Sequence, residues 1–469
     1  MSKSITYDKF DFGLDLRKGP STSDANRLRV LKNAYVTEGK TIRKRPGLTK
    51  IATLEAGTTG LFAGNGKLNT FYGGTGVITH ANTLFQAHNT RHPTTAALAL
   101  STVHYADVFN GFVYASVQYS DGSIKYHYMD GAAPGLTHIA DVNCPNTKQV
   151  TKIASKIWSV GIVGDTVRFC KTNAPRDWTT VNDAGFLPVG LQQSGANQAT
   201  ALGFYNNRLV VFFADSAQIW SVDPNPALHA FLQAVDVGAT LPYAHANMSG
   251  DVFFISPSGV RTITRQDVTT NLIDADVGSP IDYELLKGTY INLATARAQF
   301  YRGGGQFWLY AGSKVMVFTF ARTAGISAWG EYNYPYNIDY ADELNAELYI
   351  RSGNDVYKVD RTVKTDNGVL YRVEIETPYL DFKSPGILKQ ITGMDAVITD
   401  SCTITHRFDA RNQSLITDPP VSISNDTRPG YIFPIELLAT NIAPVIINYD
   451  SNEFELHQLT YIFDNLGPL

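Results

Sequence analysis

The residues of this sequence best suited to chemistry are four carboxylates in one short segment. Asp339, Asp342, Glu343 and Glu347 lie close together around the letters DELNAE. A glycosidase needs two carboxylates about 5–10 Å apart in a cleft, where they act as acid and as base or nucleophile. The same letters are also typical of a polar loop between two strands. We favour this second interpretation, and it predicts no catalytic residue here.

Other chemical motifs are weak or absent. The segment YSDGSIKY at 119–126 is faintly similar to the Asp-box turn of sialidases, but it lacks the closing Trp, and Asp-Gly is an ordinary hairpin turn. The nucleophile elbow, the phosphate-binding loop, the zinc-protease helix and the EF-hand loop do not occur. His88 and His92 are four positions apart, but Pro93 disfavours the helix that a zinc site would use. We therefore expect no enzyme, no metal and no cofactor.

Composition restricts the class of protein. Of 469 residues, 44% are hydrophobic and 17% are charged, against about 25% charged in ordinary soluble domains. The 25 Tyr, 24 Phe and 38 Gly favour strands and turns over surface helices. A net charge of -4 argues against a broadly basic nucleic-acid binder. The N-terminal letters contain no apolar core of a signal peptide, and no window reaches the roughly 18 apolar residues of a membrane span.

The three cysteines do not suggest a shared function. Cys144, Cys170 and Cys402 lie far apart, without the spacing of a metal or redox motif. They argue against a disulfide framework and fit assembly in a reducing cytoplasm.

One unit recurs along the middle of the chain and must position any site. A polar turn opens onto an apolar strand, and a second turn leads to an alternating strand, as at 203–222 and 246–263. Other copies start at Leu61, Val108, Ile153, Gln299 and Tyr340. Starts about 40–55 residues apart are typical of propeller blades. We predict an all-β chain with a β-propeller of six or seven blades over residues 56–365.

Three tryptophans fit this prediction. Trp158, Trp220 and Trp308 fall in strands of separate units beside Phe and Val. We expect them to pack between blades, and not to stack on a ligand.

The composition changes near 365–368. Short strands separated by Pro and Gly turns follow, which predicts a separate C-terminal antiparallel domain, similar to a β-sandwich, over residues 366–469.

The N-terminal segment 1–55 is predicted to be an arm followed by a basic hairpin at 30–50. Residues 17–50 hold ten Lys and Arg against only Asp24 and Glu38. These charges form a possible contact patch for an acidic partner, or simply a solvated hairpin. The patch residues are Arg27, Arg29, Lys32, Lys40, Arg43 and Lys44. We also expect the hairpin to close the ring beside the last blade, because closure removes exposed sheet edges.

The letters NAYVTEGKTIRKRPGL at 33–48 resemble the opening of the packaged-DNA stabilization and tail nozzle proteins of short-tailed bacteriophages. The pattern is an Asn, an aromatic residue, a Gly turn, an apolar residue and Arg-Pro-Gly. The matching positions are Asn33, Tyr35, Gly39, Ile42, Arg45, Pro46 and Gly47. The segments 168–179, 201–222 and 376–395 are similar to the same family.

This resemblance implies a structural protein of the virion tail, assembled in the host cytoplasm. Six copies would form a ring below the portal and adaptor, and their shared channel would retain packaged double-stranded DNA and conduct it during ejection without sequence-specific binding. Tail fibres or spikes would be further partners. Because such a channel would be neutral or acidic, the basic hairpin would face a neighbouring subunit or the adaptor.

Two alternatives remain open. A carbohydrate-binding or glycan-cleaving propeller would carry an aromatic and carboxylate cluster at one mouth. An intracellular scaffold is the other alternative, although the repeats lack the Gly-His and Trp-Asp signatures of common scaffold propellers.

Overall fold

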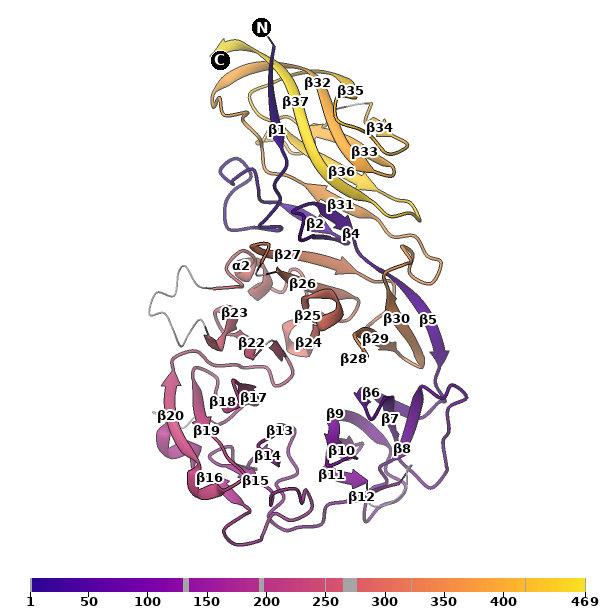
Figure 1. The fold of residues 1–469 in the computed structure, drawn as a ribbon, viewed down its shortest axis with the longest axis vertical. Coiled ribbons are helices and arrows are strands. Elements are labelled where there is room, and N and C mark those ends of the chain that lie inside the picture. The colour runs from indigo at the N-terminus through magenta and orange to yellow at the C-terminus, as the bar shows by residue number, and fades with distance from the viewer. Residues whose placement is uncertain are drawn as a thin grey trace.

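The structure is a computed structural model that describes residues 2–129, 135–193, 198–248, 250–264, 276–321, 323–417 and 419–468. Strands dominate it, and most of them form a ring of small sheets with a second body above the ring (Figure 1). The all-β class with a β-propeller is confirmed.

Seven sheets make up the ring within the described residues, and they follow one another in chain order. Blade 1 holds β6 (Thr58–Gly64), β7 (Lys67–Tyr72) and β8 (Phe85–Asn89). Blade 2 holds β9 (Leu100–Phe109), β10 (Phe112–Tyr119), β11 (Ile124–Met129) and β12 (Leu136–His138). Blade 3 holds β13 (Val150–Ile153), β14 (Lys156–Val160), β15 (Val167–Phe169) and β16 (Gly185–Leu187). Blade 4 holds β17 (Ala201–Tyr205), β18 (Arg208–Phe212), β19 (Ala217–Ser221) and β20 (Ala230–Val235); blade 5 holds β21 (His245–Met248), β22 (Asp251–Ser256) and β23 (Gly259–Thr262). Blade 6 holds β24 (Arg297–Tyr301), β25 (Gln306–Ala311), β26 (Lys314–Ala321) and β27 (Ile326–Asn333), and blade 7 holds β28 (Tyr340–Leu344), β29 (Glu347–Ser352) and β30 (Asp355–Asp360).

Local turn chemistry explains why these segments fold as hairpins. Asn206 and Asn207 have φ angles of 45° and 60°, as both central residues of a type I′ turn require. Asn65 and Gly66 repeat this geometry between β6 and β7, with φ angles of 51° and 70°. The short helix α2 (Asp282–Leu286) follows blade 5.

A strand from the N-terminal segment closes the ring. β5 (Gly47–Thr53) pairs antiparallel with β30 and becomes the outer strand of blade 7. Pairing beside the last blade was expected of the hairpin at 30–50, but the strand that makes it follows the hairpin, whose own strands β3 (Ala34–Val36) and β4 (Ile42–Lys44) lie in the second body. The segment 47–53 belongs to the propeller, whereas the sequence boundaries had placed it in the arm.

The second body is a sandwich of two sheets. One sheet has the order β3 (Ala34–Val36), β4 (Ile42–Lys44), β37 (Glu455–Pro468), β32 (Ile387–Thr399) and β35 (Ile432–Ala439), and β1 (Lys3–Tyr7) also pairs with β37. The other contains β2 (Val30–Lys32), β31 (Val373–Glu376), β36 (Ala443–Asn448), β33 (Cys402–Arg407) and β34 (Val421–Ile423). The predicted hairpin is present, since β3 and β4 pair antiparallel from Ala34–Lys44 to Val36–Ile42.

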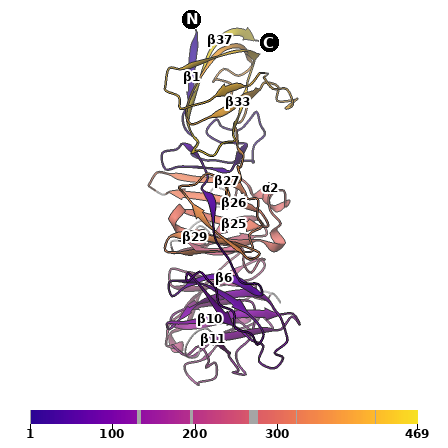
Figure 2. The same cartoon turned by 90° about the vertical axis from the view of Figure 1, so that its right-hand side faces the viewer.

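The sandwich is continuous with the propeller, although the sequence predicted a separate domain. β2 pairs parallel with β27 of blade 6 on one side and antiparallel with β31 on the other. One nine-stranded sheet therefore runs from the propeller into the sandwich. Figure 2 shows the two bodies stacked end to end, with both termini at the far end of the sandwich.

The three tryptophans lie in the core between blades, as predicted. Trp158 and Trp220 share an apolar cluster from blades 3 and 4, and Trp308 belongs to a cluster from blades 6 and 7. Trp158 and Trp308 are fully buried. Each blade thus depends on its neighbour for the burial of its aromatic face.

Removing residues 1–50 should make the chain insoluble. The deletion takes away most of β5 together with β1, β2, β3 and β4, and it exposes the edge of β30 from Tyr357 to Asp360, which includes the fully buried Val359. An exposed apolar edge strand pairs with other chains. Expression and centrifugation measure the soluble fraction, and removal of residues 2–8, which takes only β1 of the sandwich edge, is the control. A soluble 1–50 deletion with the melting temperature of the full chain would contradict the closing role.

Candidate functional site

Three of the residues that carry the family resemblance, Asn33, Arg45 and Gly47, meet at a buried joint between the propeller and the sandwich. The guanidinium of Arg45 is fully buried and donates two hydrogen bonds to the carboxylate of Asp366, with N–O distances of 2.8 and 2.6 Å. It also donates to the side chain of Asn33 at 2.9 Å and to the carbonyl of Asn333 at 2.9 Å. Two parallel bonds to a carboxylate are the strongest arrangement that an Arg can make.

Two aromatic rings enclose this ion pair. The Cζ atom of Arg45 lies 3.7 Å from the ring centroid of Tyr371 and 4.1 Å from that of Tyr334. The hydroxyl of Tyr371 donates to the carbonyl of Arg45 at 2.5 Å. These contacts offset the cost of moving a guanidinium out of water.

The backbone beside Arg45 accepts only certain residues. Asn33 has a φ of 54°, a left-handed conformation that Asn tolerates better than most residues. Its side chain accepts the amide of Asn333 and donates to the carbonyl of Arg372. A Cβ at Gly47 would stand 2.2 Å from the carbonyl oxygen of Thr365, so only Gly fits.

The other four positions of the motif are Tyr35, Gly39, Ile42 and Pro46. Ile42 is fully buried in the sandwich core, and Tyr35 lies opposite Arg43 in the hairpin. Pro46 lines the cleft between the propeller and the hairpin. Gly39 sits in the turn, where Lys40 and not Gly39 has the positive φ, 65°.

The six residues of the predicted basic patch all have partners within the chain. Arg27 pairs with Asp15, Arg29 with Glu376, Lys32 with Glu374, Lys40 with Asp11 and Arg43 with Glu455. Lys44 is fully buried and donates to Asn448 and to the carbonyl of Asp450. Burial lowers the pKa of Lys44 to about 8. Contact of this patch with another protein stays a prediction, but the buried Lys44 has no part in its surface.

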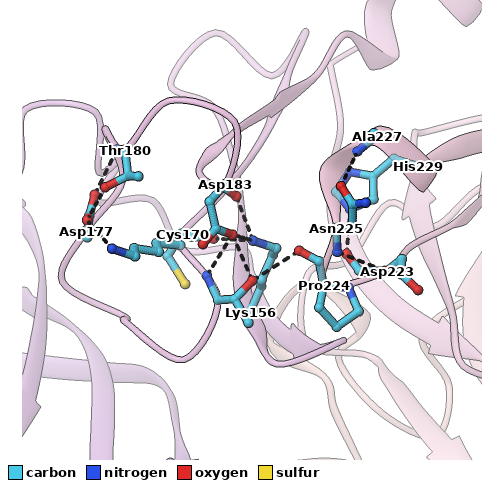
Figure 3. A network of polar contacts seen from close by, with 12 residues as sticks. Lys156, Cys170, Asp177, Thr180, Asp183, Asp223, Pro224, Asn225, Ala227 and His229 are labelled. Carbon is cyan, nitrogen blue, oxygen red and sulfur yellow. Dashed lines mark hydrogen bonds and ion pairs between the residues drawn. The ribbon is translucent and has the colours of Figure 1, made fainter.

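The second resembling segment, 168–179, is also structural. Lys156 of β14 is fully buried, and its Nζ donates to the side chain of Asp183 at 2.5 Å and to the carbonyl of Cys170 at 3.3 Å (Figure 3). Thr172 donates to Pro224 at 3.1 Å and so ties the loops of blades 3 and 4 together.

The central channel of the propeller forms a cavity of about 700 Å³. It is lined by the first strands of the blades, β6, β9, β13, β17, β21, β24 and β28. Most of these strands precede the strong hairpin signal of their unit, so apart from Asp342 and Glu343 on β28 their polar residues are not site candidates in the sequence. Assigning the first strand of each unit to the channel would have found His104, Asp107 and Arg297.

Two of the four candidate carboxylates face this channel. Asp342 Oδ2 accepts the amide of Ala63 in blade 1 at 2.8 Å. Glu343 accepts the amide of Arg302 beside blade 6. Asp339 instead accepts the amide of Gly353 in its own blade, and Glu347 pairs with Lys358 on the outside.

The channel carboxylates therefore join neighbouring blades. Asp342 Oδ1 also accepts the side chain of Gln299 in blade 6 at 3.3 Å. Asp107 of blade 2 pairs with Lys152 of blade 3 at 2.7 Å. Because each carboxylate is held by a neighbouring blade, the arrangement stabilises the ring.

Burial affects the protonation of Asp342. The pKa of this carboxyl is raised to about 6, mainly by desolvation. Hydrogen bonds from main-chain amides lower the pKa, and the negative charges of Asp107 and Glu343 raise it. Asp342 thus gains a proton at a pH where a free Asp would stay charged.

A polar bridge crosses the channel between opposite blades. The hydroxyl of Tyr243, before β21, lies 2.5 Å from Nδ1 of His104 on β9. The other ring nitrogen of His104 lies 2.9 Å from the side chain of Gln118. Burial lowers the pKa of His104 to about 4, so the ring is neutral in this bridge.

The remaining sequence candidates are structural elements. The segment 119–126 is the turn between β10 and β11, as expected for a hairpin. His88 lies 2.7 Å from the side chain of Asn69, and His92 packs edge-on against Tyr119. Among the described residues, no group of three or more His, Cys, Asp or Glu side chains could hold a metal ion, and no helix is long and apolar enough to cross a membrane.

Comparison with known proteins adds distant likenesses only. No family model and no curated protein matches the chain. Among solved structures, the chain is similar to YCF48 bound to D1 peptide, with 10% identity, a TM-score of 0.38, and coverage of 68% of this chain and 98% of that one. The WD40 domain of Neurospora crassa Pan2 has 9% identity, a TM-score of 0.33, and coverage of 71% and 88%. Raptor from Chaetomium thermophilum has 12% identity and a TM-score of 0.35, and the match covers 57% of this chain and 24% of Raptor.

Replacing Arg45 with Met should destabilise the chain by about 3–5 kcal/mol, because Asp366 is left buried without a counter-ion. Urea unfolding followed by Trp fluorescence measures the change. The control is Arg43→Met in the same hairpin, where the side chain is 38% exposed and the expected loss is below about 1 kcal/mol. Equal losses in the two variants would contradict the role of the joint.

The stability of the wild type relative to Asp342→Asn should depend on pH. Because the folded pKa of about 6 lies above that of an unfolded Asp, the folded chain binds an extra proton between the two values. This contribution is fully present at low pH and is lost as the pH rises through 6. Melting temperatures at pH 5 and pH 8 test it, with Asp339→Asn as the control for loss of a carboxylate from the same blade. If the melting temperatures of the wild type and of Asp342→Asn differed by the same amount at pH 5 and pH 8, the raised pKa of Asp342 would be contradicted.

Proposed function

We propose that the chain is a structural subunit of the tail of a short-tailed bacteriophage. Six copies form a nozzle ring below the portal and adaptor, retain the packaged DNA, conduct it during ejection and dock tail fibres or spikes. The proposal rests on the resemblance at 33–48 together with one observation in the structure. That observation is the buried joint at Arg45.

The joint gives the resembling residues a common mechanical role. Asn33, Arg45 and Gly47 lock the N-terminal segment against Asp366, where the propeller passes into the sandwich. The sheet through β27, β2 and β31 makes the same connection by main-chain hydrogen bonds. An elongated body without a hinge at its middle suits a wall that must withstand the pressure of packaged DNA.

The channel of one propeller does not suit DNA passage. Tyr243 and His104 from opposite blades touch across it, so a duplex cannot pass. In this proposal, DNA passes through the space that six copies enclose between them. The propeller is then a wall element, and its polar centre is not the conduit.

Exposed apolar side chains offer contacts for neighbouring copies. Val142, Ile162, Val181 and Leu191 are each 80–91% exposed on loops of blade 3 and the segments around it. Groups of exposed apolar residues typically mark protein interfaces.

We propose no enzymatic activity. The carboxylates that a glycan-cleaving propeller would use accept hydrogen bonds from other blades, as the contacts of Asp342 and Glu343 show. Acid and base catalysis needs groups that are free to exchange protons with a substrate.

Purified protein should assemble into rings with six times the mass of the 51.5 kDa chain. Ring closure through repeated subunit interfaces gives one discrete species. Mass photometry of the purified protein and of disrupted virions measures it, and electron microscopy shows the symmetry. A strictly monomeric chain in both samples would rule out the nozzle ring.

A further inference from the structure

Arg297 is an unusual residue in the channel wall. Its guanidinium carbon lies 4.9 Å from the ring centroid of Tyr243 and 4.8 Å from that of Tyr340. The side chain is half-buried and lines the central cavity. Within the described residues, this guanidinium makes no hydrogen bond and no ion pair. Arg297 lines the cavity, so these donors are available to a ligand there.

The wall beside Arg297 is positive. Lys148 lines the same cavity, is exposed, and has no ion-pair partner within the described parts of the chain. Burial is the main cause of the lowered pKa of His104, and its hydrogen bond to Gln118 raises that pKa. The positive charges of Lys148 and Arg297 lower the pKa further, so both cations lie close enough to His104 to act on it. An anionic group in this region would neutralise two unpaired cations.

Three carboxylates lie on the channel wall formed by blades 2 and 7, and one of them, Asp107, is paired with Lys152. Asp107, Asp342 and Glu343 line it, and Asp107 and Glu343 both raise the pKa of Asp342 by their charge. Carboxylates are acceptors for hydroxyl groups, whereas they repel the phosphates of a polyanion. A matching ligand carries no more than one negative charge per sugar residue, together with several hydroxyl groups.

Arg297 can also be reached from a second cavity, of about 440 Å³. The hydroxyl-bearing residues Thr59, Ser101 and Thr102 line that cavity together with Arg297. Arg297 thus borders both cavities.

We propose that the propeller channel binds a saccharide that carries a carboxylate, such as a uronic acid residue. The carboxylate forms two parallel hydrogen bonds with Arg297, next to the charge of Lys148, and sugar hydroxyls donate to Asp342 and Glu343. A cavity of 700 Å³ lies inside the usual range of ligand pockets, about 300–1,000 Å³. This inference does not depend on the nozzle assignment, because it concerns the centre of one propeller.

Titration of the full chain with digalacturonate tests the proposal, by calorimetry and by saturation-transfer NMR. We expect saturable binding of digalacturonate, with binding of neutral digalactoside about tenfold weaker or more because it lacks the charge-assisted bonds. Inorganic phosphate is the third probe, and it should bind more weakly than digalacturonate because it lacks the sugar hydroxyls that meet the channel carboxylates.

Arg297→Gln should weaken digalacturonate binding by about tenfold or more, since Gln cannot form the two charged bonds. The matched control is Arg208→Gln, an exposed Arg at the start of β18 outside the cavity, which should bind as the wild type does. Melting curves show whether Arg297→Gln folds. If it does not, Lys148→Gln on the exposed wall supplies the test, with an expected loss of about threefold.

Several results would overturn the proposal. They are no binding of digalacturonate by the wild type, equal binding of digalacturonate and digalactoside, phosphate binding that matches or exceeds digalacturonate, and unchanged binding by a folded Arg297→Gln. Where Arg297→Gln does not fold, unchanged binding by Lys148→Gln has the same consequence.

Discussion

The buried ion pair between Arg45 and Asp366 is the interaction on which the rest of the architecture depends. A charge in the interior is stable only with a close partner and further hydrogen bonds, and Arg45 has both. The pair joins residues 321 positions apart in the chain. It fixes the N-terminal segment at the point where three structures meet: the last blade, the nine-stranded sheet and the sandwich hairpin.

On either side of Arg45, the N-terminal segment contributes strands to a different body. Towards the sandwich, Val30–Lys32 and Ala34–Val36 enter two different sheets, so the hairpin region spans the sandwich core. Towards the propeller, β5 leaves the joint immediately after Gly47 and completes blade 7. The close approach of Gly47 to Thr365 explains why a small residue follows Arg45 and Pro46. The N-terminal fifty residues thus contribute strands to both bodies.

Much of the fold could be predicted because it depends on local signals. Turns such as Asn206-Asn207 and apolar strands beside them occur at blade spacing, and Trp158 and Trp308 mark the faces between blades. The pairing of β2 with β27 could not be predicted, because three residues at 30–32 carry no information about a partner almost 300 positions away. The prediction that Lys44 belongs to a surface patch was wrong for a similar reason. This basic residue of a polar hairpin is buried beside Asn448 and Asp450, which are distant in the sequence.

The candidate sites divide in the same way. The motif at Asn33, Arg45 and Gly47 was visible as a pattern, but its meaning as a joint required the position of Asp366. Arg297 lies in the first strand of blade 6 and Tyr243 lies just before the first strand of blade 5, where hairpin signals are weak, and only the ring brings them together. A ligand site in the propeller channel is compatible with a structural role of the joint at Arg45, since the blades separate the two places.

Hydrogen exchange of the wild-type chain tests most directly whether the joint makes one body of the propeller and the sandwich. The central claim predicts that the amides of β5, β27, β31 and β36 exchange slowly and at a common limiting rate, because their opening requires the same unfolding event. Fast exchange throughout the sandwich strands, with β5 and β27 still protected, would contradict it and would show two bodies that open independently.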